Sequence, residues 1–116
     1  MVLSGNTIGN IQHEQRTRVL KEMSIIAGKE GLCLMINWNS DFFGNSLQHF
    51  YSQHDDVIGS FEKAKVNFTH CTLYQPDTKY STKWFNKYEC ESLGYSSGWD
   101  VLHYGNFELA SFAVGR

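Results

Sequence analysis

The sequence predicts an α+β fold in which an N-terminal helix packs on an antiparallel sheet of about five strands, ending in a four-stranded meander. Two patterns support this prediction: apolar residues recur at helical spacing over residues 11–27, and the period changes to two after residue 65. The aromatic content of 15% also suits a pleated sheet. A length of 116 residues, without a linker or low-complexity tract, predicts a single domain.

The first element that we expect is a helix over residues 11–27. Residues 1–9 are rich in Gly, Asn and Thr, and we expect them to be frayed. Asn10 suits the N-cap position, and Gly28 suits a C-terminal stop. The apolar stripe of this helix consists of Ile11, Val19, Leu20, Met23, Ile26 and Ala27.

The apolar run 32–38 predicts a strand covered on both faces, because the run is too short for a core helix. Residues 39–65 are less regular. Asn45 is a candidate cap for a short helix, and Asp55 or Asp56 is a candidate cap for a second one.

Alternating side chains predict two long strands over residues 66–75 and 80–90. The segment Pro76-Asp77-Thr78 predicts the turn between them, because proline presets φ and aspartate hydrogen-bonds back to the chain. Residues 92–98 are rich in Gly and Ser, which predicts a flexible loop.

The register of these two strands follows from matching their apolar faces. This matching places Tyr74 opposite Tyr80 and His70 opposite Trp84. It also requires a bulge near Lys79, because the loop is longer than a tight turn.

The last predicted element is a hairpin of strands 99–104 and 107–114. Gly105-Asn106 separates them, and such a dipeptide is typical of a two-residue turn with a positive φ. The strand 107–114 carries few charges and, if it lies at the edge of the sheet, offers a surface for a homodimer.

Charge and hydropathy exclude several classes of protein. The net charge of −2 makes nucleic acid binding unlikely as a function, because such domains usually carry a basic excess. The start shows no signal-peptide pattern and no apolar run is long enough to span a bilayer, so we expect no membrane association. Three scattered cysteines without CxxC spacing suit reduced thiols, and we expect a cytoplasmic protein.

No motif for a cofactor, a metal or a catalytic nucleophile stands out. The histidines lack HxxxH and HxH spacing, and glycine-rich phosphate loops and the GxSxG elbow are missing. We therefore expect no cofactor and no metal site, and we favour a non-enzymatic protein.

The segment His70-Cys71-Thr72-Leu73 resembles one half of the tandem His-x-Thr-apolar signature of the 2H phosphoesterases. In that family, two such motifs bring two histidines and two threonines into one cleft. The segment His103-Tyr104-Gly105 does not match the second motif, so this chain lacks the acid that would complement the base.

The predicted register leads to an alternative function, namely a small-molecule-binding or hydrolytic domain with an aromatic-lined pocket. A histidine on the apolar face of a strand is either a hydrogen-bonded core residue or the polar group of a ligand pocket. The residues of this alternative pocket are His70, Tyr80, Trp84 and Tyr88.

The preferred function rests on residues 30–62, which carry a charge of −5 and contain neither Lys nor Arg. Carboxylates of this kind steer a basic protein partner, and exposed aromatic side chains anchor it. Small inhibitors, immunity-type proteins and counter-defence proteins have this size and charge, so we expect a protein of that class. The predicted partner-binding residues are Asp41, Phe42, Phe43, Asp55, Asp56 and Glu62.

Overall fold

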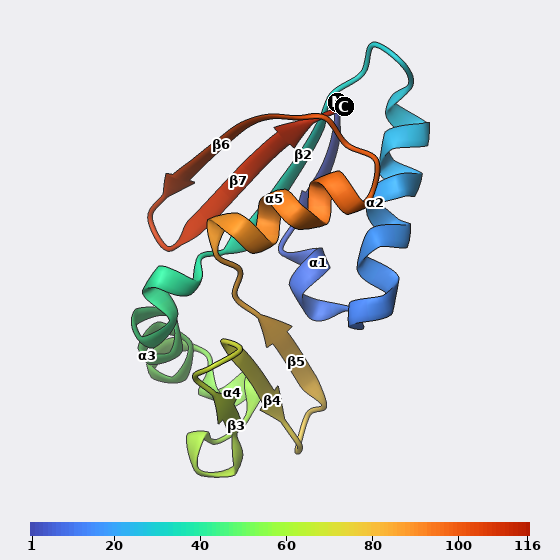
Figure 1. Cartoon of the computed structure of the whole chain (residues 1–116). Coiled ribbons are helices and arrows are strands. Elements are labelled where there is room, and N and C mark those ends of the chain that lie inside the picture. The colour runs from blue at the N-terminus through green and yellow to red at the C-terminus, as the bar shows by residue number, and fades with distance from the viewer.

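The computed structural model describes all residues, Met1–Arg116, and shows an α+β protein with two separate sheets (Figure 1). The helices are α1 (Thr7–Asn10), α2 (His13–Ala27), α3 (Phe43–Gln53), α4 (Asp55–Ile58) and α5 (Lys87–Ser96), with 3-10 turns η1 (Ser40–Phe42) and η2 (Phe61–Lys63). The strands are β1 (Val2–Gly5), β2 (Cys33–Trp38), β3 (Lys65–Asn67), β4 (Thr72–Gln75), β5 (Tyr80–Lys83), β6 (Val101–Phe107) and β7 (Ala110–Gly115).

The larger sheet has four strands in the order β1-β2-β7-β6. Strands β1 and β2 are parallel, whereas β7 runs antiparallel to both of its neighbours. Helices α2 and α5 cover one face of this sheet, and the two chain termini meet at one end of it (Figure 1). Side chains of β2 alternate accordingly: Cys33, Met35 and Asn37 are buried, and the residues between them are partly exposed.

Residues 39–85 form what we call the middle lobe, which holds the three-stranded sheet β3-β4-β5 together with α3 and α4. The chain enters and leaves this lobe at adjacent points, because Asn39 and Phe85 form a parallel bridge. The Phe85 amide donates to the Trp38 carbonyl over 2.8 Å, and the Ser40 amide donates to the Phe85 carbonyl over 3.0 Å. The molecule is elongated as a result, with extents of 47 × 24 × 23 Å.

Two hydrophobic clusters correspond to these two parts. The first includes Leu20 and Met35 and lies between the helices and the larger sheet, and the second includes Leu47 and Leu73 in the middle lobe. The consecutive residues Trp84 and Phe85 belong to different clusters, since neighbouring side chains of extended backbone point in opposite directions.

The predicted N-terminal helix and the strand after it are confirmed, with corrections at their ends. The helix spans residues 13–27, and Gly28 follows it with a φ of 80°, a positive value that favours glycine. Asn10 is not its cap; Gln12 occupies that position without a side-chain bond. Residues 1–9 are not frayed, because β1 pairs with β2 and Ile8 of α1 is fully buried.

The predicted strand 66–75 is wrong, because a turn over residues 68–71 divides it into β3 and β4. The Asn67 side chain accepts hydrogen bonds from the amides of Thr69 and His70, each over 2.9 Å, which closes this turn. The turn after Gln75 is confirmed, but the predicted register is shifted by one residue, because Gln75 pairs with Tyr80.

The predicted strand 80–90 ends at Lys83, and the expected loop 92–98 is mostly helix α5. The C-terminal hairpin exists, but its turn lies at residues 108–109, and Gly105 and Asn106 are strand residues of β6. The Phe112 ring covers Gly105 so closely that an added Cβ would lie 2.6 Å from its Cζ. This packing explains why glycine stands inside the strand.

The expected five-stranded antiparallel sheet and its four-stranded meander are therefore replaced by two smaller sheets. Strand β7 lies between β2 and β6, so the residues proposed as a dimerising edge are in the interior of the larger sheet. None of the helices has both the length and the apolar character that crossing a bilayer requires.

Candidate functional site

The predicted acidic residues all lie in the middle lobe with their side chains in solvent. Asp41 lies in η1 just before α3, Asp55 and Asp56 begin α4, and Glu62 lies in η2. None of these carboxylates forms an ion pair. The nearest cation in the sequence, Lys63, pairs with Asp77 over 3.4 Å. These four carboxylates thus make no direct contact with a cationic side chain.

The two predicted aromatic anchors have different environments. Phe42 is 37% exposed, whereas Phe43 is buried in the second cluster. The Phe43 ring meets Trp84 edge-on with centroids 4.8 Å apart, so it is a core residue and cannot serve as an anchor without unfolding the lobe.

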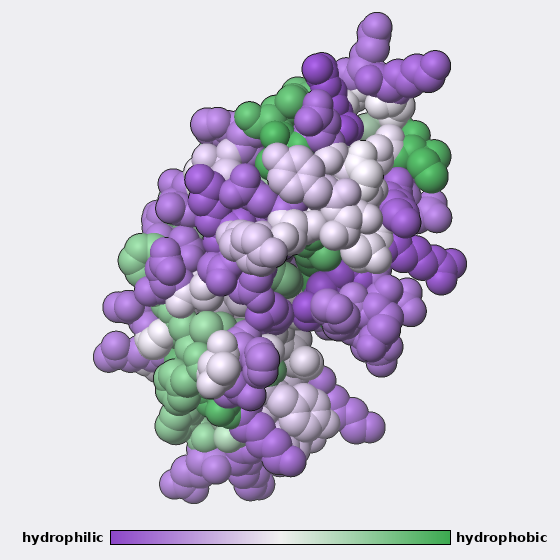
Figure 2. Space-filling model, in the orientation of Figure 1, coloured by the Kyte–Doolittle hydropathy of each residue, from purple (hydrophilic) through white to green (hydrophobic).

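An open groove of about 500 Å³ runs along the outer face of α3. We call this feature the α3 groove, and the space-filling view shows hydrophobic side chains gathered around this part of the molecule (Figure 2). Helical spacing produces its floor, because residues 44, 47, 48, 51 and 52 share one face. Its lining residues are Gly44, Leu47, Gln48, Tyr51, Ser52, Phe61 and Phe68.

The two walls of the α3 groove are aromatic rings that are held against the core. Phe61 is 58% exposed and meets the Tyr51 ring edge-on at 5.1 Å. Phe68 is 72% exposed and meets Phe43 edge-on at 5.4 Å, in the turn that Asn67 closes. These rings are positioned by packing, and they still expose large apolar area, as a recognition surface requires.

Buried polar contacts fix the floor of the groove. The Tyr51 hydroxyl donates to Gln75 Oε1 over 2.9 Å, and Gln75 Nε2 donates to the Ser60 carbonyl over 3.0 Å. Burial raises the pKa of Tyr51, and the neighbouring Tyr80 raises it further. The Tyr51 phenol therefore remains a donor at neutral pH.

The residues of the predicted alternative pocket do not line a common cavity. His70 is exposed in the turn after β3, and Trp84 is fully buried in the second cluster. Tyr88 is 77% exposed on α5 and does not line the small cavity that Tyr80 shares with Trp38 and Phe50. The one-residue shift in register and the unexpected helix α5 separate these side chains.

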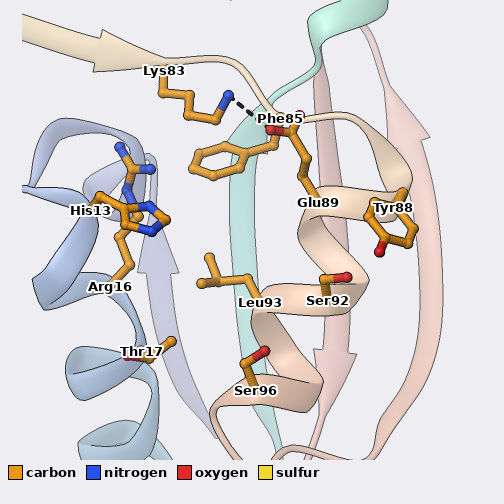
Figure 3. Close-up of a pocket in the computed structure, with 10 residues that line it drawn as sticks. All are labelled: His13, Arg16, Thr17, Lys83, Phe85, Tyr88, Glu89, Ser92, Leu93 and Ser96. Carbon is orange, nitrogen blue, oxygen red and sulfur yellow. Dashed lines mark ion pairs between the residues drawn. The ribbon is translucent and has the colours of Figure 1, made fainter. Parts of the chain in front are cut away.

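A second groove, of about 300 Å³, lies between α2 and α5, and we call it the α2–α5 groove (Figure 3). Arg16 of α2 lies at its base, Phe85 forms part of its wall, and Lys83 reaches across to Glu89. The Lys83 ammonium and the Glu89 carboxylate are 2.9 Å apart. The lining residues are His13, Arg16, Thr17, Lys83, Phe85, Tyr88, Glu89, Ser92, Leu93 and Ser96.

The outer face of the larger sheet is a further apolar surface. Helices α2 and α5 lie on the opposite face, and Leu3, Leu102 and Phe107 are each about half exposed or more. This open sheet face has few carboxylates, in contrast to the middle lobe.

No protein-family model matches the chain, and no curated protein matches its sequence. The structure contains no group of three or more His, Cys, Asp and Glu side chains that could hold a metal ion. The site must therefore be interpreted from its own chemistry.

Sequence reasoning found the carboxylates and missed both grooves. The sequence pattern predicts a helix through Phe61 and a strand at Phe68, and it identifies neither ring as a groove wall. The available signals were Asn67, which starts a turn at Phe68, and Gly59, which interrupts the helix before Phe61.

Proposed function

We propose that this chain is a non-enzymatic protein-binding module of the inhibitor, immunity or counter-defence type, and that its α3 groove docks a basic segment of a protein partner. The single observation that supports this most is the combination of an apolar groove with unpaired carboxylates in the same lobe. Recognition sites commonly join an apolar centre to a charged rim in this way.

Charge complementarity supports a basic partner. The segment 30–62 carries −5 without a single Lys or Arg, so a cationic surface that approaches this segment is attracted to it. Asp41 precedes α3 and Asp55 follows it, which puts negative charge near both ends of the groove. The open sheet face lacks this feature, which is why we favour the α3 groove.

The groove also fits a segment of secondary structure in size. Helix α3 has 11 residues, which at a rise of 1.5 Å gives a length of about 16 Å. A short amphipathic helix or strand of the partner could place two or three apolar side chains between Phe61 and Phe68.

Affinity capture from the native host, with matched variants, tests this proposal. Phe61→Ser with Phe68→Ser removes both walls, and both side chains are exposed, so the fold should persist. Phe107→Ser on the open sheet face is the matched control. We expect one basic partner to bind the wild type and the control and to be lost from the double variant. Equal capture by all three proteins would refute the role of the groove.

Association kinetics with the captured partner test the electrostatic part separately. Reversing charge with Asp55→Lys and Asp56→Lys should slow association at low salt by about tenfold or more, because steering acts on the on-rate. Glu22→Lys on α2, away from the middle lobe, is the control. An unchanged on-rate for the Asp55 and Asp56 variant would show that these carboxylates do not steer the partner.

A further inference from the structure

Arg16 is a largely buried cation that makes no ion pair. Its side chain is 8% exposed. Its Nε donates to the Ile8 carbonyl over 2.9 Å, and its guanidinium lies 5.2 Å from the centroid of the Phe85 ring. The two terminal nitrogens make no hydrogen bond within the chain. Proteins rarely bury a charge in this way unless a counter-charge is supplied.

Arg16 is placed so that its side chain lines a groove that a ligand could enter. Arg16 lines the α2–α5 groove, where its side chain rises from the first turns of α2 beside Phe85 (Figure 3). Leu93 and Phe85 provide apolar walls, and hydroxyl groups of Thr17, Ser92 and Ser96 lie along the same groove. A few convergent polar groups in an apolar cleft are typical of small-molecule sites.

The charges that line the groove favour a single negative charge on the ligand. Lys83 and Glu89 neutralise each other at 2.9 Å, and Lys83 also donates to the His70 carbonyl over 2.7 Å. The Arg16 guanidinium makes no ion pair, although Glu89 and Glu14 lie near enough to favour its charged form, so its terminal N–H groups stay available to a ligand. A planar guanidinium fork matches a carboxylate, to which it can donate two parallel hydrogen bonds.

We propose that the α2–α5 groove binds the carboxylate of a small organic acid, with Arg16 as the anchor and Phe85 and Leu93 as the walls for its apolar body. The α2–α5 groove is separate from the α3 groove proposed to bind protein, so either proposal can be refuted without affecting the other. Burial also lowers the pKa of Arg16, against the opposing influence of Glu89 and Glu14, as expected for a cation whose solvent has been removed.

The test uses benzoate as the probe and benzamide as an uncharged probe of the same shape. Titration is followed by two-dimensional ¹H–¹⁵N NMR, with the Arg16 Nε–H resonance and the amides of Ser92 and Leu93 as reporters. We expect benzoate to shift these resonances saturably in the millimolar range, as suits a fragment-sized ligand, and benzamide to leave them unchanged. Phenyl phosphate, a dianion, should bind more weakly than benzoate.

Variants at Ser92 test the site without disturbing Arg16, which also supports the fold. Ser92→Glu supplies an internal carboxylate, and Ser92→Gln supplies a neutral side chain of the same size. Benzoate should bind Ser92→Glu at least about tenfold more weakly than Ser92→Gln, because the added carboxylate competes for the guanidinium. Arg16→Lys, which keeps the charge but loses the fork, should also weaken binding.

Several outcomes would overturn the proposal. They are an absence of saturation with benzoate, an equal response to benzamide, and binding of phenyl phosphate without benzoate. Equal benzoate affinity of the two Ser92 variants would likewise show that Arg16 is not the anchor.

Discussion

At the scale of single residues, Gln75 connects three parts of the middle lobe. It is fully buried in β4, accepts a hydrogen bond from Tyr51 of α3, and donates to Ser60 in the loop before η2. A buried amide with both ends satisfied stabilises a unique arrangement, because any displacement leaves a polar group unpaired. Gln75 thus orients the Tyr51 ring, against which Phe61 packs.

Alkaline pH should destabilise the folded chain through two partly buried phenols, those of Tyr51 and Tyr80. Burial raises the pKa of both Tyr51 and Tyr80 in the folded state. The unfolded chain loses these protons near a pH of about 10, whereas the folded chain retains them, so the unfolded state binds fewer protons. Stability must then fall as pH rises through this value.

Urea denaturation at several pH values from about 9 to 11 checks this expectation. The variant Tyr51→Phe with Tyr80→Phe should lose stability less steeply above a pH of about 10 than the wild type does. The readout is the slope of the unfolding free energy against pH, because the loss of the Tyr51 hydrogen bond lowers stability equally at every pH. An unchanged slope would show that these phenols are solvated.

At the scale of elements, helix α5 is specified by its first turn. Asn86 accepts a hydrogen bond from the Glu89 amide over 2.7 Å, and Glu89 Oε1 accepts one from the Asn86 amide over 3.1 Å, which together form a capping box. Glu89 also pairs with Lys83 at the end of β5. The helix is therefore tied to the strand that precedes it.

Replacing Asn86 with Ala should lower the free energy of unfolding by about 1 kcal/mol, since one cap is lost. The matched control is Asn45→Ala on α3, at an exposed helical position without a capping bond. Urea denaturation of both variants provides the comparison. If Asn86→Ala proves no more destabilising than the control, the capping box contributes nothing to stability.

The same segment shows what the sequence could predict and what it could not. The amphipathic pattern of residues 13–27 and the apolar run 33–38 identify their elements, since local periodicity and flanking glycines settle both. Polar and apolar side chains also alternate over residues 84–90, which favours a strand. Asn86 and Glu89, however, stand at the spacing of a capping box, and this signal correctly favours a helix. Gly105-Asn106 has the local composition of a turn. It lies in a strand because the Phe112 ring packs against Gly105, and this contact cannot be read from the neighbouring sequence.

At the scale of the whole molecule, two hydrophobic clusters are joined by the chain itself. Trp84 packs in one cluster and Phe85 in the other, and Asn39 pairs with Phe85 where the middle lobe begins and ends. Helix α1 packs on β5, which adds a contact between the two parts. The carboxylates of the candidate site were predictable from composition, whereas both grooves depend on such long-range packing.

Gly9 tests how tightly the two parts are coupled. A Cβ at this position would lie 2.7 Å from the Lys83 carbonyl oxygen, a backbone atom that cannot turn aside. Gly9→Ala should therefore destabilise the protein by about 1–3 kcal/mol, as overpacking does. Gly44→Ala, which meets no atom within 4 Å in helix α3, should instead be neutral or stabilising.

Thermal unfolding of the Gly9 and Gly44 variants, followed at separate probes for each cluster, gives the comparison. We expect one cooperative transition in which Trp84 and Trp99 report the same midpoint, since the two clusters share a continuous chain path. Two resolved transitions in the wild type would contradict this expectation of a single folding unit.

Amide hydrogen exchange of the chain, alone and bound to its captured partner, tests the proposed docking surface most directly. The account predicts slowed exchange over residues 44–68, which include α3 and both aromatic walls, with β6 and β7 unchanged. Slowed exchange confined to residues 101–115, with residues 44–68 unaffected, would place the partner on the open sheet face and contradict the account.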